Sequence, residues 1–122
     1  MFQYISDIHL ECMGKIIDYS SIIKPVDGSP YLILAGDIGR VFYQTPCRGL
    51  NVVHYQEFIK YCAERWQQIF LVIGNHESYG KSIIATRQRV RNIARSYLNV
   101  HYMENSTVEL PELEIYIAGC MK

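Results

Sequence analysis

Two short, continuous runs of apolar residues constrain the fold of this chain more than any other feature. The first is LILA at residues 32–35, and the second is FLVI at residues 70–73. Strands that are apolar at every position are covered on both faces, which is typical of the parallel sheets of α/β proteins. The sequence therefore predicts a parallel sheet whose carboxyl edge receives the residues that follow each strand, and ligands bind at that edge in such folds.

Amphipathic helix patterns alternate with these runs. Residues 51–66 and 81–97 each carry one apolar stripe at helical spacing, and in the first helix this stripe is Val52, Tyr55, Ile59, Cys62 and Trp66. A loop at residues 24–30 separates the strand-like start FQYIS from the second strand, and short strand signals follow residue 99. This order predicts a single α/β domain over residues 1–122, with a layered sheet, flanking helices and a hairpin-rich C-terminal part.

The charge and the cysteine content exclude several classes of protein. Twelve basic and twelve acidic residues cancel, so nucleic acid is not indicated as a partner, and neither is an anionic membrane. No apolar run approaches transmembrane length, and no signal peptide precedes the first strand. The four cysteines lack paired C-x-x-C spacing, which is typical of reduced thiols. We therefore expect a cytoplasmic protein.

Polar residues whose side chains can bind a metal ion follow three of the predicted strands. Asp7 and His9 follow the first, Asp37 follows the second, and Asn75 and His76 follow the third. Any one of them has an ordinary explanation, since aspartate caps turns and histidine can be a satisfied core residue. Three such groups after three buried runs are poorly explained in that way. If the strands are parallel neighbours, the side chains converge at one edge, and their oxygen and nitrogen atoms suit manganese, iron or zinc.

The blocks DIH, GDIGR and GNHE, in this order and at these separations, resemble the first three signature blocks of the calcineurin-like metallophosphoesterases. The later stretches NVHYMENSTVEL and EIYIAG are also similar to the strands that follow the third block in that family. The resemblance implies a layered metallophosphoesterase fold and a pair of divalent metal ions. It implies that Asp7 and His9 bind the first ion, that Asp37 bridges the two ions and that Asn75 binds the second.

The same resemblance implies roles in the reaction on a phosphate-ester substrate. His76 is expected to act as the catalytic general acid or electrostatic partner of the scissile phosphate, which suits an imidazole near neutral pH. Asn75 and Arg40 are expected to contact the phosphate, although Arg40 is one position away from the family spacing relative to Asp37. Glu77 is expected to orient His76 and not to bind a metal.

The chain departs from the family pattern after the third block. The family has two later histidine blocks, usually GH and GHxH, which these 122 residues lack. The remaining histidines, His54 and His101, have no preceding glycine, and we expect them to have core or surface roles. The pattern is C-terminally incomplete and suggests a chain truncated before the second half of the fold. The cofactor content expected here is therefore one ion, or none, in place of the family's two.

Two functions stay open from the sequence. The first is a metal-dependent phosphoesterase that hydrolyses phosphate monoesters or diesters and is weak or inactive in this truncated form. The alternative is a non-catalytic structural or binding module that retains the half-fold. Because an uncovered sheet seeks a partner, we also expect a protein partner or a second copy to cover the incomplete sheet.

Overall fold

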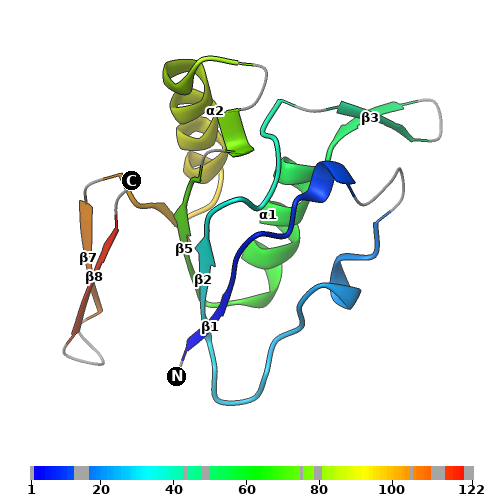
Figure 1. Cartoon of the computed structure of the whole chain (residues 1–122). Coiled ribbons are helices and arrows are strands. Elements are labelled where there is room, and N and C mark those ends of the chain that lie inside the picture. The colour runs from blue at the N-terminus through cyan, green and yellow to red at the C-terminus, as the bar shows by residue number, and fades with distance from the viewer. Residues whose placement is uncertain are drawn as a thin grey trace.

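A four-stranded parallel sheet forms the centre of the molecule. The computed structural model describes residues 2–12, 17–42, 44–47, 50–74, 76–78, 81–104, 106–110 and 115–119. In spatial order the strands are β1 (Phe2–Ile5), β2 (Tyr31–Ala35), β5 (Gln68–Val72) and β6 (Val100–Tyr102), and all neighbours run parallel. The predicted parallel sheet is confirmed, and the three strands that precede the polar blocks lie side by side (Figure 1).

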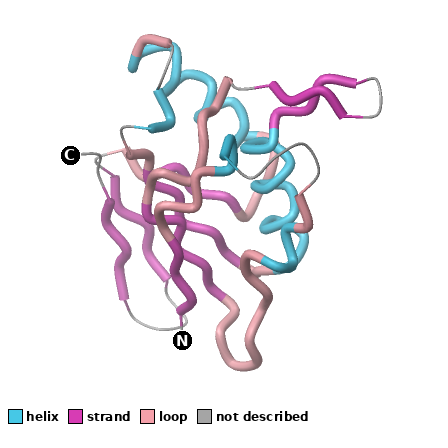
Figure 2. The backbone as a smooth tube through the Cα atoms, turned by 45° about the vertical axis from the view of Figure 1, so that its right-hand side comes forward, coloured by secondary structure: helices cyan, strands magenta, loops and turns pink. Residues whose placement is uncertain are grey.

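Two helices connect these strands and pack on the sheet (Figure 2). The helix α1 (His54–Arg65) precedes β5, and α2 (Ile83–Arg95) links β5 to β6. The helix α2 begins after Ser82, whose hydroxyl accepts a hydrogen bond from the amide of Ala85 at 3.1 Å and so caps its first turn. Within the described ranges, no helix has both the length and the apolar character needed to cross a bilayer.

Alternation along β2 divides the core between the two faces of the sheet. Leu32 and Leu34 are fully buried in the larger apolar cluster, which includes residues of both helices. Tyr31 belongs to a second apolar cluster with Phe70. The strands β7 (Ser106–Leu110) and β8 (Ile115–Gly119) form an antiparallel hairpin, and Val108 of β7 packs against this second cluster. Successive side chains of a strand point to opposite faces. The sheet is therefore a middle layer between the helices and this hairpin (Figure 1).

The structure differs from the sequence prediction just before α1. The helix predicted for residues 51–66 begins only at His54, because Leu50–Val53 forms β4 and pairs antiparallel with β3 (Gln44–Cys47). The β-branched residues Val52 and Val53 favour a strand. Pro46 lies in the partner strand, and proline is rare inside strands, so the pattern gave no hairpin signal there. The second helix is shorter than the predicted 81–97 at both ends.

Three arginines of α2, Arg87, Arg89 and Arg91, contact residues outside the helix. The guanidinium of Arg91 is bound to Glu104, since its Nε and Nη2 atoms donate to that carboxylate at 3.2 and 2.8 Å. The Nε atom of Arg87 lies 3.8 Å from the same carboxylate, and Arg89 donates to Gln56 of α1 at 3.0 Å. These contacts join α2 to neighbouring segments, and they give no indication of an anion-binding site on this helix.

The side chain of Gln3 joins three segments near the start of the sheet. Its Oε1 atom accepts hydrogen bonds from the indole Nε1 of Trp66 at 2.8 Å and from the amide of Val26 at 3.1 Å. Its Nε2 atom donates to the carbonyl of Lys24 at 2.8 Å. Trp66 is only 3% exposed, so its indole N–H has little access to water. One amide group thereby attaches β1, the loop before β2 and the end of α1 to one another.

We expect Gln3→Ala to lower the free energy of unfolding by about 1–3 kcal/mol, because it leaves a buried indole N–H without its acceptor. Urea denaturation measures this change. The control is Gln67→Ala at an exposed neighbouring position, which should stay within about 0.5 kcal/mol of the wild type. A Gln3→Ala variant as stable as the control would contradict this role.

Candidate metal centre

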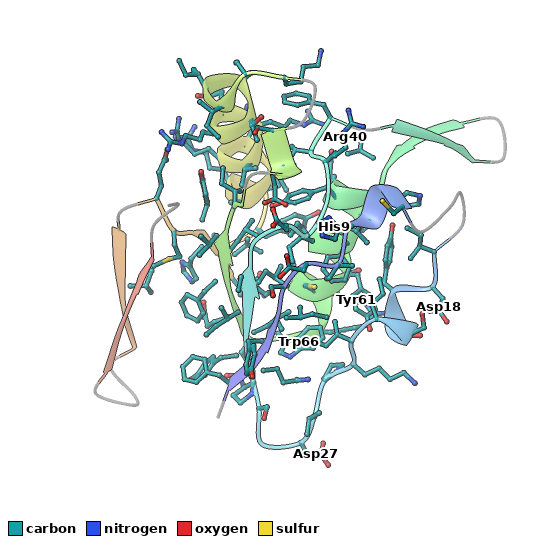
Figure 3. All side chains as sticks on the ribbon, in the orientation of Figure 1. His9, Asp18, Asp27, Arg40, Tyr61 and Trp66 are labelled. Atoms are coloured by element: carbon teal, nitrogen blue, oxygen red, sulfur yellow. The ribbon has the colours of Figure 1, made fainter. Side chains whose placement is uncertain are left out.

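The segments after β1 and β2 continue side by side beyond the ends of the strands. The amide of Asp7 donates to the carbonyl of Gly36 at 3.0 Å, and the amide of His9 donates to the carbonyl of Asp37 at 3.2 Å. These two hydrogen bonds bring the loops that carry Asp7, His9 and Asp37 together at the carboxyl edge of the sheet. Figure 3 labels His9 on the segment that follows β1.

The same three residues have an unusual backbone conformation. Their φ angles are 55° at Asp7, 54° at His9 and 52° at Asp37, and no other non-glycine residue in the described ranges has a positive φ. A positive φ is uncommon outside glycine and costs on the order of 1–3 kcal/mol when it is strained. Such strain gathers at functional sites, where the surrounding structure holds it in place. The sequence patterns gave no sign of this feature.

The chain that follows β5 meets the loop of Asp37 at Gly74. A Cβ atom on Gly74 would lie 2.8 Å from the Cγ atom of Asp37 and 3.0 Å from its amide nitrogen. The carboxylate of Asp37 is therefore packed directly against the main chain that follows β5. Gly36 is similarly close, since a Cβ atom there would lie 3.2 Å from the amide nitrogen of Gly74. The absence of side chains at both positions lets the second and third loops touch.

The buried carboxylate of Glu77 joins the loop after β2 to the loop after β5 through hydrogen bonds. Glu77 is 1% exposed, and its carboxylate accepts hydrogen bonds from the amides of Asp37 at 3.0 Å, Gly39 at 3.2 Å and Gly74. Burial raises the pKa of Glu77, the three amide donors lower it in part, and the nearby Asp37 raises it further. The expected role of Glu77 in orienting His76 stays a prediction, because the side chain of His76 lies outside what the structure describes. The structure places the carboxylate of Glu77 on main-chain amides of two different loops.

The remaining residues of the predicted site are placed less completely. Asn75 lies outside the described residues. His76 begins the short 3-10 helix η3 (His76–Ser78), and its side chain also lies outside what the structure describes. Arg40 is half-buried and follows Gly39 in the loop after β2. Figure 3 labels it toward the same end of the sheet as His9.

The donor atoms have suitable chemistry for a divalent ion, but they do not form a closed cluster. Two carboxylates and an imidazole lie on adjacent loops, and this is a donor set that manganese, iron and zinc accept. Among the described residues, however, no three His, Cys, Asp or Glu side chains converge as a formed metal site. The part of the site that the structure describes therefore fits an ion by residue type and location.

The two other histidines of the chain have partners elsewhere. The Nδ1 atom of His54 is hydrogen-bonded to the hydroxyl of Tyr19 at 2.9 Å, and His54 is buried. The Nε2 atom of His101 is 2.6 Å from Oε1 of Gln68, and its ring stacks on Phe70 with centroids 5.3 Å apart. Burial lowers the pKa of His101. These contacts agree with the core and surface roles expected from the sequence.

Comparison with known proteins gives one match. A family model described as calcineurin-like phosphoesterase matches residues 4–118, which is nearly the whole chain. No curated protein matches the chain, and no solved structure matches it either.

We expect Gly74→Ala to displace the carboxylate of Asp37, because the added methyl group and that carboxylate cannot occupy the same space. The free energy of unfolding should fall by about 1–3 kcal/mol, as for other overpacked sites. The amide resonance of Asp37 in a ¹H–¹⁵N spectrum should shift as well.

The matched control is Gly28→Ala, where φ is 81° and an added Cβ atom meets nothing within 4 Å. This change introduces backbone strain of about 1–2 kcal/mol without touching the site. The resonance of Asp37 should stay in place in the control. An unshifted Asp37 resonance in Gly74→Ala would disprove the contact.

Proposed function

Because the chain belongs to the calcineurin-like phosphoesterase family, we propose that it is a metal-dependent phosphoesterase that acts on phosphate monoesters or diesters. One observation carries the proposal beyond family membership. The loops that bear Asp7, His9 and Asp37 are hydrogen-bonded at one edge of a parallel sheet, and each of these residues has a positive φ. Strain concentrated on three ligand-type residues is typical of a site whose geometry is set by function.

In this proposal Asp7 and His9 hold a first ion, Asp37 is shared between two ions, and Asn75 contributes to the second. The position of Asp37 supports its shared role, since its carbonyl accepts from His9 on one side and its carboxylate packs on Gly74 on the other. Divalent ions held by these residues would supply Lewis-acid polarisation of a phosphoryl oxygen and would lower the pKa of a bound water molecule.

The other residues act on the substrate. His76 donates a proton to the leaving oxygen of the ester, which an imidazole can do near neutral pH. Arg40 and Asn75 bind the phosphate, and the guanidinium of Arg40 offsets part of its negative charge. Glu77 keeps the loops in place through main-chain amides, so it positions the site without touching the substrate.

We expect turnover below the value of about 10 per second that is typical of enzymes. Within these 122 residues no glycine-histidine block follows the third motif, and His54 and His101 are engaged with Tyr19 and Gln68. The second ion therefore has few protein donors in this chain, and weak binding of that ion weakens the stabilisation of the transition state.

A non-catalytic binding module is the second candidate. The observation that favours it is the lack of a formed cluster of three donors among the described residues. The two candidates differ in one result, since a binding module would release no phosphate or alcohol from any ester while keeping its fold.

The test combines manganese titration calorimetry with hydrolysis of p-nitrophenyl phosphate and bis-(p-nitrophenyl) phosphate. We expect manganese-dependent hydrolysis that a chelator abolishes. Asp37→Asn should weaken manganese binding more than Asn75→Ala, because a shared carboxylate serves both ions and carries charge. We expect a loss of about tenfold or more for Asp37→Asn.

Asp27→Asn provides the matched control, because Asp27 is an exposed aspartate on the loop at the opposite end of the molecule (Figure 3). It should bind manganese and turn over both esters as the wild type does. Equal losses in Asp37→Asn and Asn75→Ala would contradict the shared role of Asp37. A wild-type chain that binds manganese and hydrolyses neither ester would favour the binding module.

A further inference from the structure

The carboxylate of Asp7 is hydrogen-bonded to the residue that precedes it in the chain. The hydroxyl of Ser6 donates to Oδ2 of Asp7 at 2.8 Å. Among the described residues this is the one hydrogen bond that the carboxylate of Asp7 accepts. Both residues are exposed, and the terminal torsion of an aspartate has broad energy wells, so an exposed carboxylate without such a donor exchanges between several orientations. The orientation of the Asp7 side chain therefore depends on Ser6.

The main chain at Asp7 is fixed by other contacts. Its φ angle is 55°, and its amide donates to the carbonyl of Gly36 at 3.0 Å. Two residues later, the amide of His9 donates to the carbonyl of Asp37 at 3.2 Å. The position of the Asp7 backbone is thus set by the neighbouring loop. Removing the hydroxyl of Ser6 should therefore change the orientation of the carboxylate without displacing the backbone that carries it.

The hydrogen bond from Ser6 makes the two oxygens of the Asp7 carboxylate unequal. The Oδ2 atom already accepts from the hydroxyl, whereas Oδ1 accepts no hydrogen bond from the described residues. An oxygen that accepts a hydrogen bond has less electron density for a metal ion, so Oδ1 is the better donor. Calcium takes six to eight oxygen ligands and often takes both oxygens of one carboxylate, whereas manganese accepts a smaller mixed set that includes imidazole.

From these contacts we infer that Ser6 is a positioning residue of the metal centre. Its hydroxyl orients Asp7 so that one carboxylate oxygen is offered to the first ion, and this arrangement favours manganese over calcium. The inference rests on the proposed function, since it takes Asp7 to be a ligand. Groups that orient a metal ligand through a hydrogen bond typically contribute about 10- to 100-fold to metal affinity.

The variant Ser6→Ala tests this inference through metal binding and does not depend on turnover. Electron paramagnetic resonance of free manganese measures the manganese affinity by titration and the calcium affinity by displacement. We expect manganese to bind about tenfold more weakly and calcium at least as tightly as in the wild type, so the ratio of the two affinities should fall about tenfold. Ser6→Thr keeps a hydroxyl at this position and should restore the wild-type ratio.

The matched control is Ser20→Ala. The hydroxyl of Ser20 donates to Oδ1 of the exposed Asp18 at 2.6 Å, so this variant removes the same kind of serine–aspartate hydrogen bond. Asp18 precedes the 3-10 helix η2 (Tyr19–Ser21), where Figure 3 labels it, and belongs to none of the loops that carry the proposed ligands. Both affinities should stay at the wild-type values. Because Ser6 is exposed, urea denaturation of Ser6→Ala should also give the stability of the wild type.

The outcomes separate the inference from the proposed function. Manganese binding that is unchanged or tighter in Ser6→Ala would overturn the inference and leave the phosphoesterase proposal standing. A parallel loss of manganese and calcium affinity would also overturn it, because a general disturbance of the site lowers both and keeps their ratio. A wild-type chain that binds no manganese would refute the proposed function and the inference together.

Discussion

The candidate site depends on the buried carboxylate of Glu77. A buried carboxylate is costly unless hydrogen-bond donors surround it, and here three main-chain amides do so. Those amides belong to the loop after β2 and to the start of the loop after β5, so one side chain joins segments that are about forty residues apart in the chain. Asp37 is held at its amide by this carboxylate, which explains how its positive φ can persist. The chemistry proposed for the site therefore depends on a residue that would touch neither metal nor substrate.

Much of the fold could be predicted from the sequence because local patterns and tertiary packing agree. In β2 every residue is apolar, and the structure buries Leu32 and Leu34 against the helices while Tyr31 packs on the other face. The hairpin of β3 and β4 could not be predicted in this way. Pro46 argues against a strand, and among the described residues the two strands pair with each other and with no further strand, so no pattern of a buried sheet marks them.

The candidate site, like the fold, could be predicted from the sequence only in part. The positions of Asp7, His9 and Asp37 follow from strand ends in a parallel sheet, and the structure brings their loops together. The role of Glu77 could not be predicted, because hydrogen bonds to the amides of Asp37 and Gly39 depend on how separate loops meet. Sequence patterns place the candidate donor residues at the ends of strands, and they do not report the main-chain contacts that support those residues.

Native-state hydrogen exchange of Glu77→Gln tests the central claim most directly. If the carboxylate of Glu77 holds the loops together, the amides of Asp37, Gly39 and Gly74 should lose protection jointly, by about tenfold or more, which corresponds to about 1.4 kcal/mol. The amide of Leu34 in β2 serves as the internal reference for global stability, and Glu57→Gln on the exposed part of α1 serves as the control variant. Protection at the three amides that changes no more than at Leu34 would contradict the account.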